Sequence, residues 1–259
     1  MKPIRLATFV ICLACIAARG QVSQSADCSL QIDKALEVTG VKDFVDQMPA
    51  QIRSQVGAQF KTTNRQLVMR ATLRMFDPAG LLRGLKKAYL RNCDPEMLQS
   101  VVATLDTPLG RRMRKLEAVA ATAEGSQETA AYRRELMLHP ASDVRYALAE
   151  RLDQLTGGSE FALAVAVGVA KGTAAAFGRP MLTDAELSFL RTQTMPFIRS
   201  AQIMSALFTY RDVSDEDLKQ YVAMYDLPAL QQFTKIFESA FVGTIDKQSQ
   251  QAALDRRPQ

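Results

Sequence analysis

The sequence predicts an all-α fold of two tandem helical-bundle repeats packed together, and three observations support this prediction. The segment Leu98–Leu105 places apolar residues at positions i, i+3, i+4 and i+7, which form one face of an α-helix. No stretch alternates apolar and polar residues for long enough to predict a β-sheet. The chain also matches itself at a shift of 117 to 120 residues, which is typical of a duplicated supersecondary unit.

The internal match has two parts. At a shift of 117 residues, the Thr-Gly pair at 39–40 aligns with the pair at 156–157, and two equally spaced phenylalanines follow in each half. At a shift of 120 residues, Asp94–Pro108 aligns with Ser214–Pro228. From these matches we divide the chain into a signal peptide at 1–20, a first repeat at 21–125, a linking helix and loop at 126–143, a second repeat at 144–247 and a flexible tail at 248–259.

Local signals predict where the helices lie. The first helix of each repeat is expected at Cys28–Val38 and Val144–Leu155, and the second begins near Phe44 and Phe161. Proline after Asp or Thr is typical of a first helical turn and predicts further starts at 78, 95 and 108. Ser214, with an acidic residue three positions later, predicts a capping box. The linking helix is expected over 127–138, because His139 and Pro140 end it.

The first 20 residues predict a secretory signal peptide. Lys2 and Arg5 give a basic start, Leu6–Ala18 is a short apolar run, and small residues precede the cleavage site. The run is shorter than the roughly 20 residues that a membrane-spanning helix needs, so we expect a periplasmic or secreted protein and not an integral membrane protein. Lipid attachment at Cys15 is the alternative. Loss of the signal removes three positive charges and lowers the formal net charge from +5 to +2.

This modest charge does not predict nucleic-acid binding, which usually concentrates basic residues on one face. The densest basic cluster lies within Arg111–Lys115. We interpret it as a solvated helix face, and an anionic lipid or another polyanion is the alternative partner.

Two cysteines, Cys28 and Cys93, remain after the signal is removed. In an oxidising compartment two such cysteines usually pair, so the sequence predicts a disulfide. The bond would close a loop of about 65 residues, a constraint worth roughly 4 kcal/mol in the chain-entropy model.

A resemblance to a known family lies in the segment YLRNCDPEMLQSVVATLDTPLGRRMRK, which is similar to a signature of exported bacterial helical proteins grouped as domain of unknown function twenty fifty-nine. The stretch ALEVTGVKDFVDQM resembles the opening helix and glycine turn of the same family. The residues that carry the resemblance are Glu96, Leu98, Pro108 and Gly110 in the first repeat, and Glu216, Leu218 and Pro228 in the second. Leu230 stands where the family has glycine. The resemblance implies a helical fold in the bacterial envelope and no established activity.

The chain is poor in the side chains that catalytic and metal sites require. His139 is the one histidine, so we expect neither a histidine-dependent nucleophile nor a closed zinc site. Glu96 and Glu216 could act as acid and base in a hydrolase, but helix capping also accounts for acidic residues at these helix starts. No glycine-rich phosphate motif occurs. The sequence therefore predicts no catalytic residue, cofactor or metal.

The most informative segment is Phe161–Phe177, because it lacks the polar residues of its counterpart in the first repeat, Phe44–Phe60. A helix that is apolar on all sides must be covered on all sides. The segment is therefore either the core helix between the repeats or the wall of a groove for an apolar ligand or a partner helix. Its small residues also permit a neighbouring helix to approach closely. The candidate residues are Phe161, Leu163, Val165, Val167, Gly168, Val169 and Phe177.

Together these patterns predict a non-enzymatic periplasmic or secreted protein that binds a partner protein or a lipid-like apolar ligand at the interface of its two repeats. Two alternatives stay open. One is a hydrolase that uses carboxylates at helix starts, and the other is a structural or stress-related factor of the cell envelope.

Overall fold

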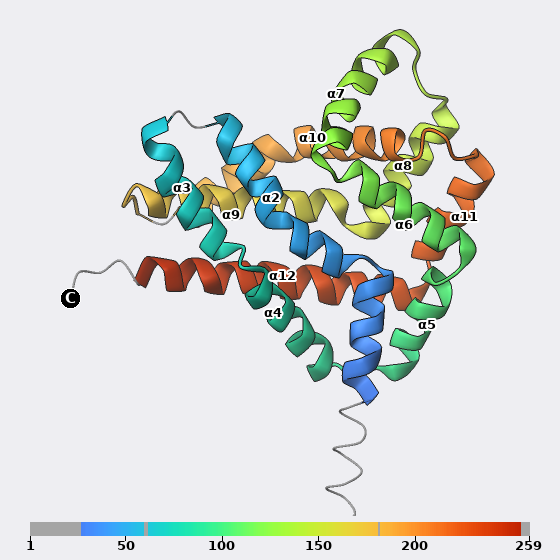
Figure 1. The fold of residues 1–259 in the computed structure, drawn as a ribbon, viewed down its shortest axis with the longest axis horizontal. Coiled ribbons are helices and arrows are strands. Elements are labelled where there is room, and N and C mark those ends of the chain that lie inside the picture. The colour runs from blue at the N-terminus through green and yellow to red at the C-terminus, as the bar shows by residue number, and fades with distance from the viewer. Residues whose placement is uncertain (1–26, 60–61, 181, 255–259) are drawn as a thin grey trace, which may run out of the picture.

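The computed structural model describes residues 27–59, 62–180 and 182–254, and the predicted signal peptide lies outside them. Within these ranges the chain forms helices joined by short turns and contains no β-strand, which confirms the all-α class (Figure 1). A first helix covers residues 27–38. The helices that follow are α2 (Val41–Gln59), α3 (Thr62–Met75), α4 (Pro78–Arg91), α5 (Pro95–Leu105), α6 (Pro108–Ala120), α7 (Ala123–Leu138), α8 (Asp143–Thr156), α9 (Gly158–Ala176), α10 (Asp184–Thr209), α11 (Asp215–Tyr225) and α12 (Pro228–Leu254).

Side-chain caps fix where several of these helices begin. Asp77, Asp94 and Thr107 accept hydrogen bonds from the backbone N–H three residues later, at 2.8, 3.0 and 3.1 Å. Each of them precedes a proline, so the predicted starts of α4, α5 and α6 are confirmed. Ser214 caps α11 in the same way, because its Oγ accepts from the N–H of Asp217 at 3.2 Å. Only this half of the predicted capping box is formed, because the Asp217 carboxylate binds Arg112 and does not accept from the Ser214 N–H.

The linking helix α7 is longer than predicted. It begins at Ala123, four residues earlier than expected, because the Thr122 side chain caps it by accepting a hydrogen bond from the N–H of Gly125 at 3.0 Å. It ends at Leu138, directly before the His-Pro pair at 139–140, as the sequence predicts. The signal at its start is a single threonine, which is weaker than the Asp-Pro and Thr-Pro pairs elsewhere.

The predicted flexible tail is wrong over its first part, because α12 continues to Leu254. Ser249 lies in this part of the helix. Its side chain is buried, and its Oγ donates a hydrogen bond to the backbone oxygen of Ile245 at 2.8 Å. A polar residue is thus accommodated inside the fold without an external partner.

Local features agree between the two halves of the chain. Gly40 and Gly157 have φ angles of 71° and 63°, in the left-handed region that favours glycine. The preceding threonines, Thr39 and Thr156, donate to the carbonyl four residues earlier at 2.7 and 2.8 Å. The helices that follow, α2 and α9, both have 19 residues, and α5 and α11 both have 11. Where the first half has the two helices α3 and α4, however, the second half has one long helix, α10, with Pro196 inside it. Duplication of the whole unit stays a prediction.

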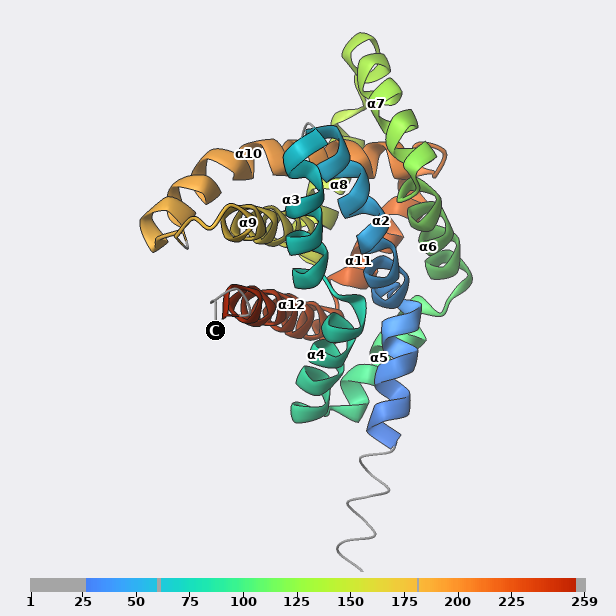
Figure 2. The same cartoon turned by 60° about the vertical axis from the view of Figure 1, so that its left-hand side comes forward.

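The last helix of the second half packs on the first half. α12 lies chiefly against α4 and α5, while α6 of the first half reaches α10 and α11 (Figure 1, Figure 2). Tyr89 of α4 donates to the backbone oxygen of Phe233 in α12 at 2.9 Å, and the two rings stack with centroids 4.7 Å apart. One core therefore holds residues of both halves, including Leu98 and Leu218. The halves share this core and do not form two separate bundles.

A second core lies between α2, α3, α4 and α12, and α9 packs against it. Two glycines of α9 explain how closely α9 approaches α3. A Cβ atom on Gly168 would lie 2.8 Å from Cζ of Phe76, and one on Gly172 would lie 3.0 Å from Cε of Met75. Larger side chains there would push the two helices apart. The small residues of α9 thus have the packing role that the sequence predicts.

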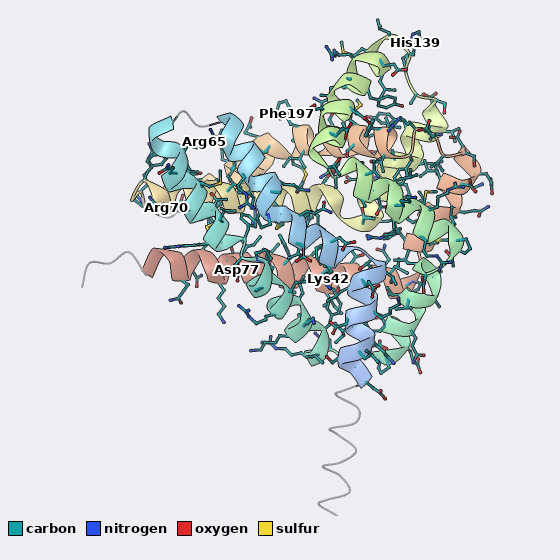
Figure 3. The ribbon with its side chains drawn as sticks, in the orientation of Figure 1. Lys42, Arg65, Arg70, Asp77, His139 and Phe197 are labelled. Atoms are coloured by element: carbon teal, nitrogen blue, oxygen red, sulfur yellow. A yellow bond between two sulfur atoms is a disulfide. The ribbon has the colours of Figure 1, made fainter. Side chains whose placement is uncertain are left out.

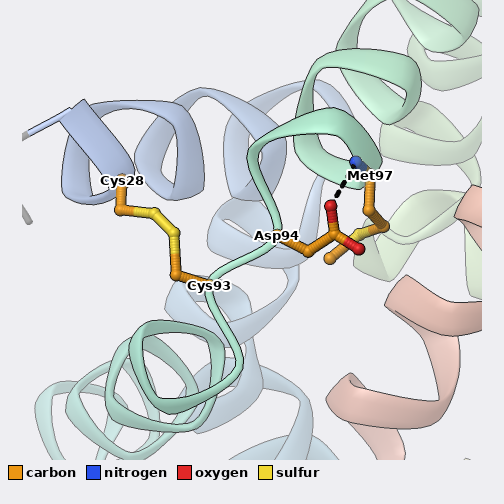
Figure 4. The surroundings of a disulfide bond; sticks show 4 residues. All are labelled: Cys28, Cys93, Asp94 and Met97. Atoms are coloured by element: carbon orange, nitrogen blue, oxygen red, sulfur yellow. Dashed lines mark hydrogen bonds between the residues drawn. A yellow bond between two sulfur atoms is a disulfide. The ribbon is translucent and has the colours of Figure 1, made fainter. Parts of the chain in front are cut away.

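Cys28 and Cys93 form the predicted disulfide, with their Cα atoms 6.3 Å apart (Figure 4). Cys28 is buried on the first helix, whereas Cys93 is exposed in the turn after α4. Asp94, which caps α5 through the N–H of Met97, follows directly. The bond therefore ties the start of the described chain to the junction between α4 and α5.

Candidate functional site

The apolar helix α9 is covered on only part of its surface. It lies between α10 and α12, with α3 against a third side (Figure 2). Leu163 and Val167 are buried, whereas Val165 and Val169 are half-buried, and Phe177 beyond the helix is 38% exposed. The helix therefore has core contacts on one side and apolar surface beside open space on another.

A cavity of about 1010 Å³ lies between α2, α9 and α10, and we call it the α9 groove. Its volume is at the upper end of the range for clefts that bind small molecules. The residues of α9 that line it are 161–162, 165–166, 169–170 and 173–174, and Phe177 follows just beyond the helix. This spacing is one face of a helix, followed over about 24 Å at a rise of 1.5 Å per residue. The groove is therefore elongated and parallel to the axis of α9.

The facing walls of the α9 groove come from α2 and α10. α2 contributes Phe44, Met48 and Ile52, which are spaced four residues apart and so share a helix face. α10 contributes Thr194 and Ile198. The spacing of these three residues could have shown that α2 has an apolar face. The sequence did not indicate which helix would lie opposite α9.

Aromatic rings gather where α9 begins. Phe44 and Phe161, which are equivalent in the internal match, meet edge to face with centroids 4.9 Å apart. Phe161 also contacts Phe241 and Phe237 of α12, at centroid distances of 4.4 and 5.3 Å. This end of the α9 groove is thus lined by rings from both halves of the chain.

A smaller cavity of about 620 Å³ lies between α9 and α12, and we call it the α12 cavity. Several charged side chains line this cavity along the length of α9 and α12. Lys171, which interrupts the apolar run of α9, pairs with Asp246 of α12 at 2.5 Å. Glu238 also lines the cavity. Burial raises the pKa of its carboxyl, and the nearby negative charge of Glu160 raises it further. Among the described residues, the α12 cavity is therefore lined by more charged side chains than the α9 groove.

The candidate residues of the apolar segment all lie on these two cavities. Phe161, Val165, Val169 and Phe177 line the α9 groove, and Phe161, Leu163, Val167 and Gly168 line the α12 cavity. Whether they contact a ligand stays a prediction.

A polar cluster around Glu117 of α6 was missed by the sequence reasoning. Its Oε1 accepts hydrogen bonds from the hydroxyls of Tyr210 and Tyr221 at 2.6 and 2.7 Å. Arg114, one turn earlier, donates to the backbone oxygen of Thr39 at 2.5 Å, and its side chain is only 18% exposed. The interpretation of the basic cluster as a solvated face is therefore wrong for Arg114. The cluster joins α6, α10 and α11 to the turn after the first helix.

Burial raises the pKa of the hydroxyls of Tyr210 and Tyr221 above the usual 10, and the negative charge of Glu117 raises it further. In the unfolded chain these tyrosines ionise near pH 10, so folding stability is fully present below that pH and falls as the pH rises above it. We expect Tyr221→Phe to reduce the slope of this loss in urea unfolding measured at stepwise alkaline pH. Tyr146→Phe, on an exposed tyrosine of α8, serves as the control. Identical slopes for wild type and Tyr221→Phe would contradict the assignment.

The residues considered for catalysis lie apart from these cavities. Glu96 and Glu216 are exposed at the starts of α5 and α11 and line none of the cavities described above. Asp217, beside Glu216, binds Nη2 of Arg112 at 2.6 Å and so joins α11 to α6. His139 is exposed at the projecting corner between α7 and α8 (Figure 3).

Comparison with protein-family models, with curated proteins and with solved structures gave no match. The resemblance to domain of unknown function twenty fifty-nine stays a prediction. Among the residues that the structure describes, no helix combines the length and hydropathy that a membrane span requires. The same part of the chain holds no group of three or more His, Cys, Asp or Glu side chains placed to bind a metal ion.

Proposed function

We propose that this protein is a non-enzymatic binding protein that holds an elongated apolar ligand in the α9 groove. The observation that carries the proposal is the continuous apolar stripe of α9, which lines an open cavity from one end of the helix to the other. The groove lies between α2 of the first half and α9 and α10 of the second. This place agrees with the binding site expected between the two repeats.

The sequence of α9 supports this proposal on energetic grounds. Its counterpart α2 carries polar residues such as Asp46 and Arg53, where α9 has Leu163 and Ala170. Apolar surface gains about 25 cal/mol for each Å² removed from water, so an uncovered apolar stripe is unfavourable until something covers it. Alanines along the stripe leave space that larger side chains would fill. A bound chain would supply the missing cover.

We also propose that the protein is exported to the periplasm or beyond. The predicted signal peptide supports export, and the Cys28–Cys93 disulfide is compatible with it, because such bonds persist in oxidising compartments. Native mass spectrometry of protein purified from its own host would detect a ligand that remains bound.

Filling the α9 groove is expected to weaken binding. Ala170 lines the groove and Ala164 lines the α12 cavity, so Ala170→Phe and Ala164→Phe place the same side chain on two sides of one helix. We expect Ala170→Phe to weaken binding of an uncharged fluorescent alkyl probe about tenfold or more, or about 1.4 kcal/mol, by occupying its space. Ala164→Phe should change the affinity much less.

Circular dichroism and thermal unfolding check that both variants fold. Equal affinities for the two variants, or a wild-type protein that binds no alkyl probe and carries no lipid, would contradict the proposed function.

A further inference from the structure

We propose that the ligand of the α9 groove carries an anionic head group, such as a carboxylate, and that Arg179 binds it. This inference rests on the proposed function and names the chemical class of the ligand. It follows from the charged residues on the described part of the groove wall, which lie near the end where α9 stops.

Among the residues that the structure describes, two charged ones line the α9 groove, Arg179 and Glu186. Glu186 already has a structural role in the capping box of α10. Its Oε2 accepts from the backbone N–H and the hydroxyl of Thr183, both at 2.8 Å, while the Thr183 hydroxyl accepts from the Glu186 N–H at 3.3 Å. Both bonds to Oε2 lower the pKa of the Glu186 carboxyl, and the bond from the backbone N–H has the larger effect. Its charge therefore serves the start of α10.

Arg179, in contrast, has no ion pair or side-chain hydrogen bond within the described ranges, 27–59, 62–180 and 182–254. Its guanidinium lies over the ring of Phe177, with Cζ 5.9 Å from the ring centroid. Gly178, at a φ of 63°, turns the chain between these two residues. The cation thus lies beside an aromatic side chain of the groove wall, with its hydrogen-bond donors available to a ligand.

Other cations near α9 do not offer the same donors to this groove. Lys171 pairs with Asp246, and both line the α12 cavity. Arg191 of α10 also lines the α12 cavity. Within the described ranges, Arg179 is therefore the cation that an anion in the α9 groove would meet, and its planar fork of donors suits a carboxylate or phosphate.

The two ends of the groove differ in a way that orients an amphipathic ligand. Phe44 and Phe161 line the end where α9 begins, and Arg179 lines the end where it stops. The negative end of the α9 helix dipole also stabilises a positive charge at this position, as Arg179 provides. A single chain would lie along α9 with its tail at the phenylalanines and its head group at Arg179.

The test compares hexadecanoate, hexadecanol and hexadecyltrimethylammonium, each titrated into the full-length protein below the concentration at which the probe itself aggregates. Wild type should bind the carboxylate about fivefold more tightly than the alcohol, the order of magnitude for a solvent-exposed charge pair. Arg179→Gln should abolish that preference and leave alcohol binding unchanged. Arg191→Gln, on the α12 cavity, is the matched control and should keep the preference. Added salt should reduce the preference in wild type.

The outcomes separate the two proposals. If wild type binds carboxylate and alcohol equally, or Arg179→Gln keeps the preference, the head-group inference is wrong while the proposed function stands. Tighter binding of the ammonium probe would also overturn the inference and would point to Glu186. If wild type binds none of the three chains, the proposed function fails as well, and a protein segment becomes the better occupant of the groove.

Discussion

Replacing Glu117 with alanine is expected to lower the free energy of unfolding by about 2–4 kcal/mol. The substitution leaves the hydroxyls of Tyr210 and Tyr221 without their acceptor, and both tyrosines are buried, at 4% and 0% exposure. Arg114 loses its neighbouring carboxylate at the same time. Urea unfolding followed by circular dichroism measures the change.

The control is Glu135→Ala, on the exposed surface of α7, which should alter stability by no more than about 0.5 kcal/mol. Glu117→Gln should fall between wild type and Glu117→Ala, because the amide oxygen still accepts a hydrogen bond but lacks the charge. If Glu117→Ala unfolds at the same urea concentration as the control, the cluster does not hold the helices together.

Removing the Cys28–Cys93 disulfide is expected to lower the free energy of unfolding by about 4 kcal/mol. The bond spans 65 residues, so it restricts the unfolded chain over a long loop. Alanine replaces both cysteines in the test variant, since Cys28 is buried and serine would bring a hydroxyl into the core. Chemical denaturation of wild type, with and without a reductant, gives the comparison.

The double alanine variant provides the control for the reductant, which should destabilise wild type and leave the variant unchanged. Thiol titration of the unfolded, unreduced wild-type protein should find no free thiol among these two cysteines. Two titratable thiols, or equal stability of wild type and variant, would refute the expectation.

The helix starts could be predicted because caps are local. Asp94 and Thr107 bond to N–H groups three residues away, and the following prolines mark the same turns. The Thr183–Glu186 capping box obeys the same rule, although the sequence reasoning did not use it. Burial of Arg114 could not be predicted, since its partner Thr39 lies far away in the chain.

Of the walls of the α9 groove, only the one formed by α9 could be predicted from the sequence. The apolar run of α9 identified a surface that needs cover, and the structure places a groove along it. The identity of the covering helices depends on tertiary packing, which periodicity does not encode. Arg179 gave no signal either, because an arginine after a glycine is ordinary in a loop. The role that we propose for it rests on the groove beside it and on the hydrogen bonds that Glu186 already makes with Thr183.

The position of α12 has a consequence for the order in which the protein can mature. Tyr89 and Leu98 belong to helices made early, yet the surface that covers them includes Phe233, which is made late. A nascent chain lacking α12 would expose the apolar side chains that α12 covers in the folded protein. Productive folding therefore has to wait for α12, and a polypeptide that stops short of it would be a substrate for chaperones and proteases.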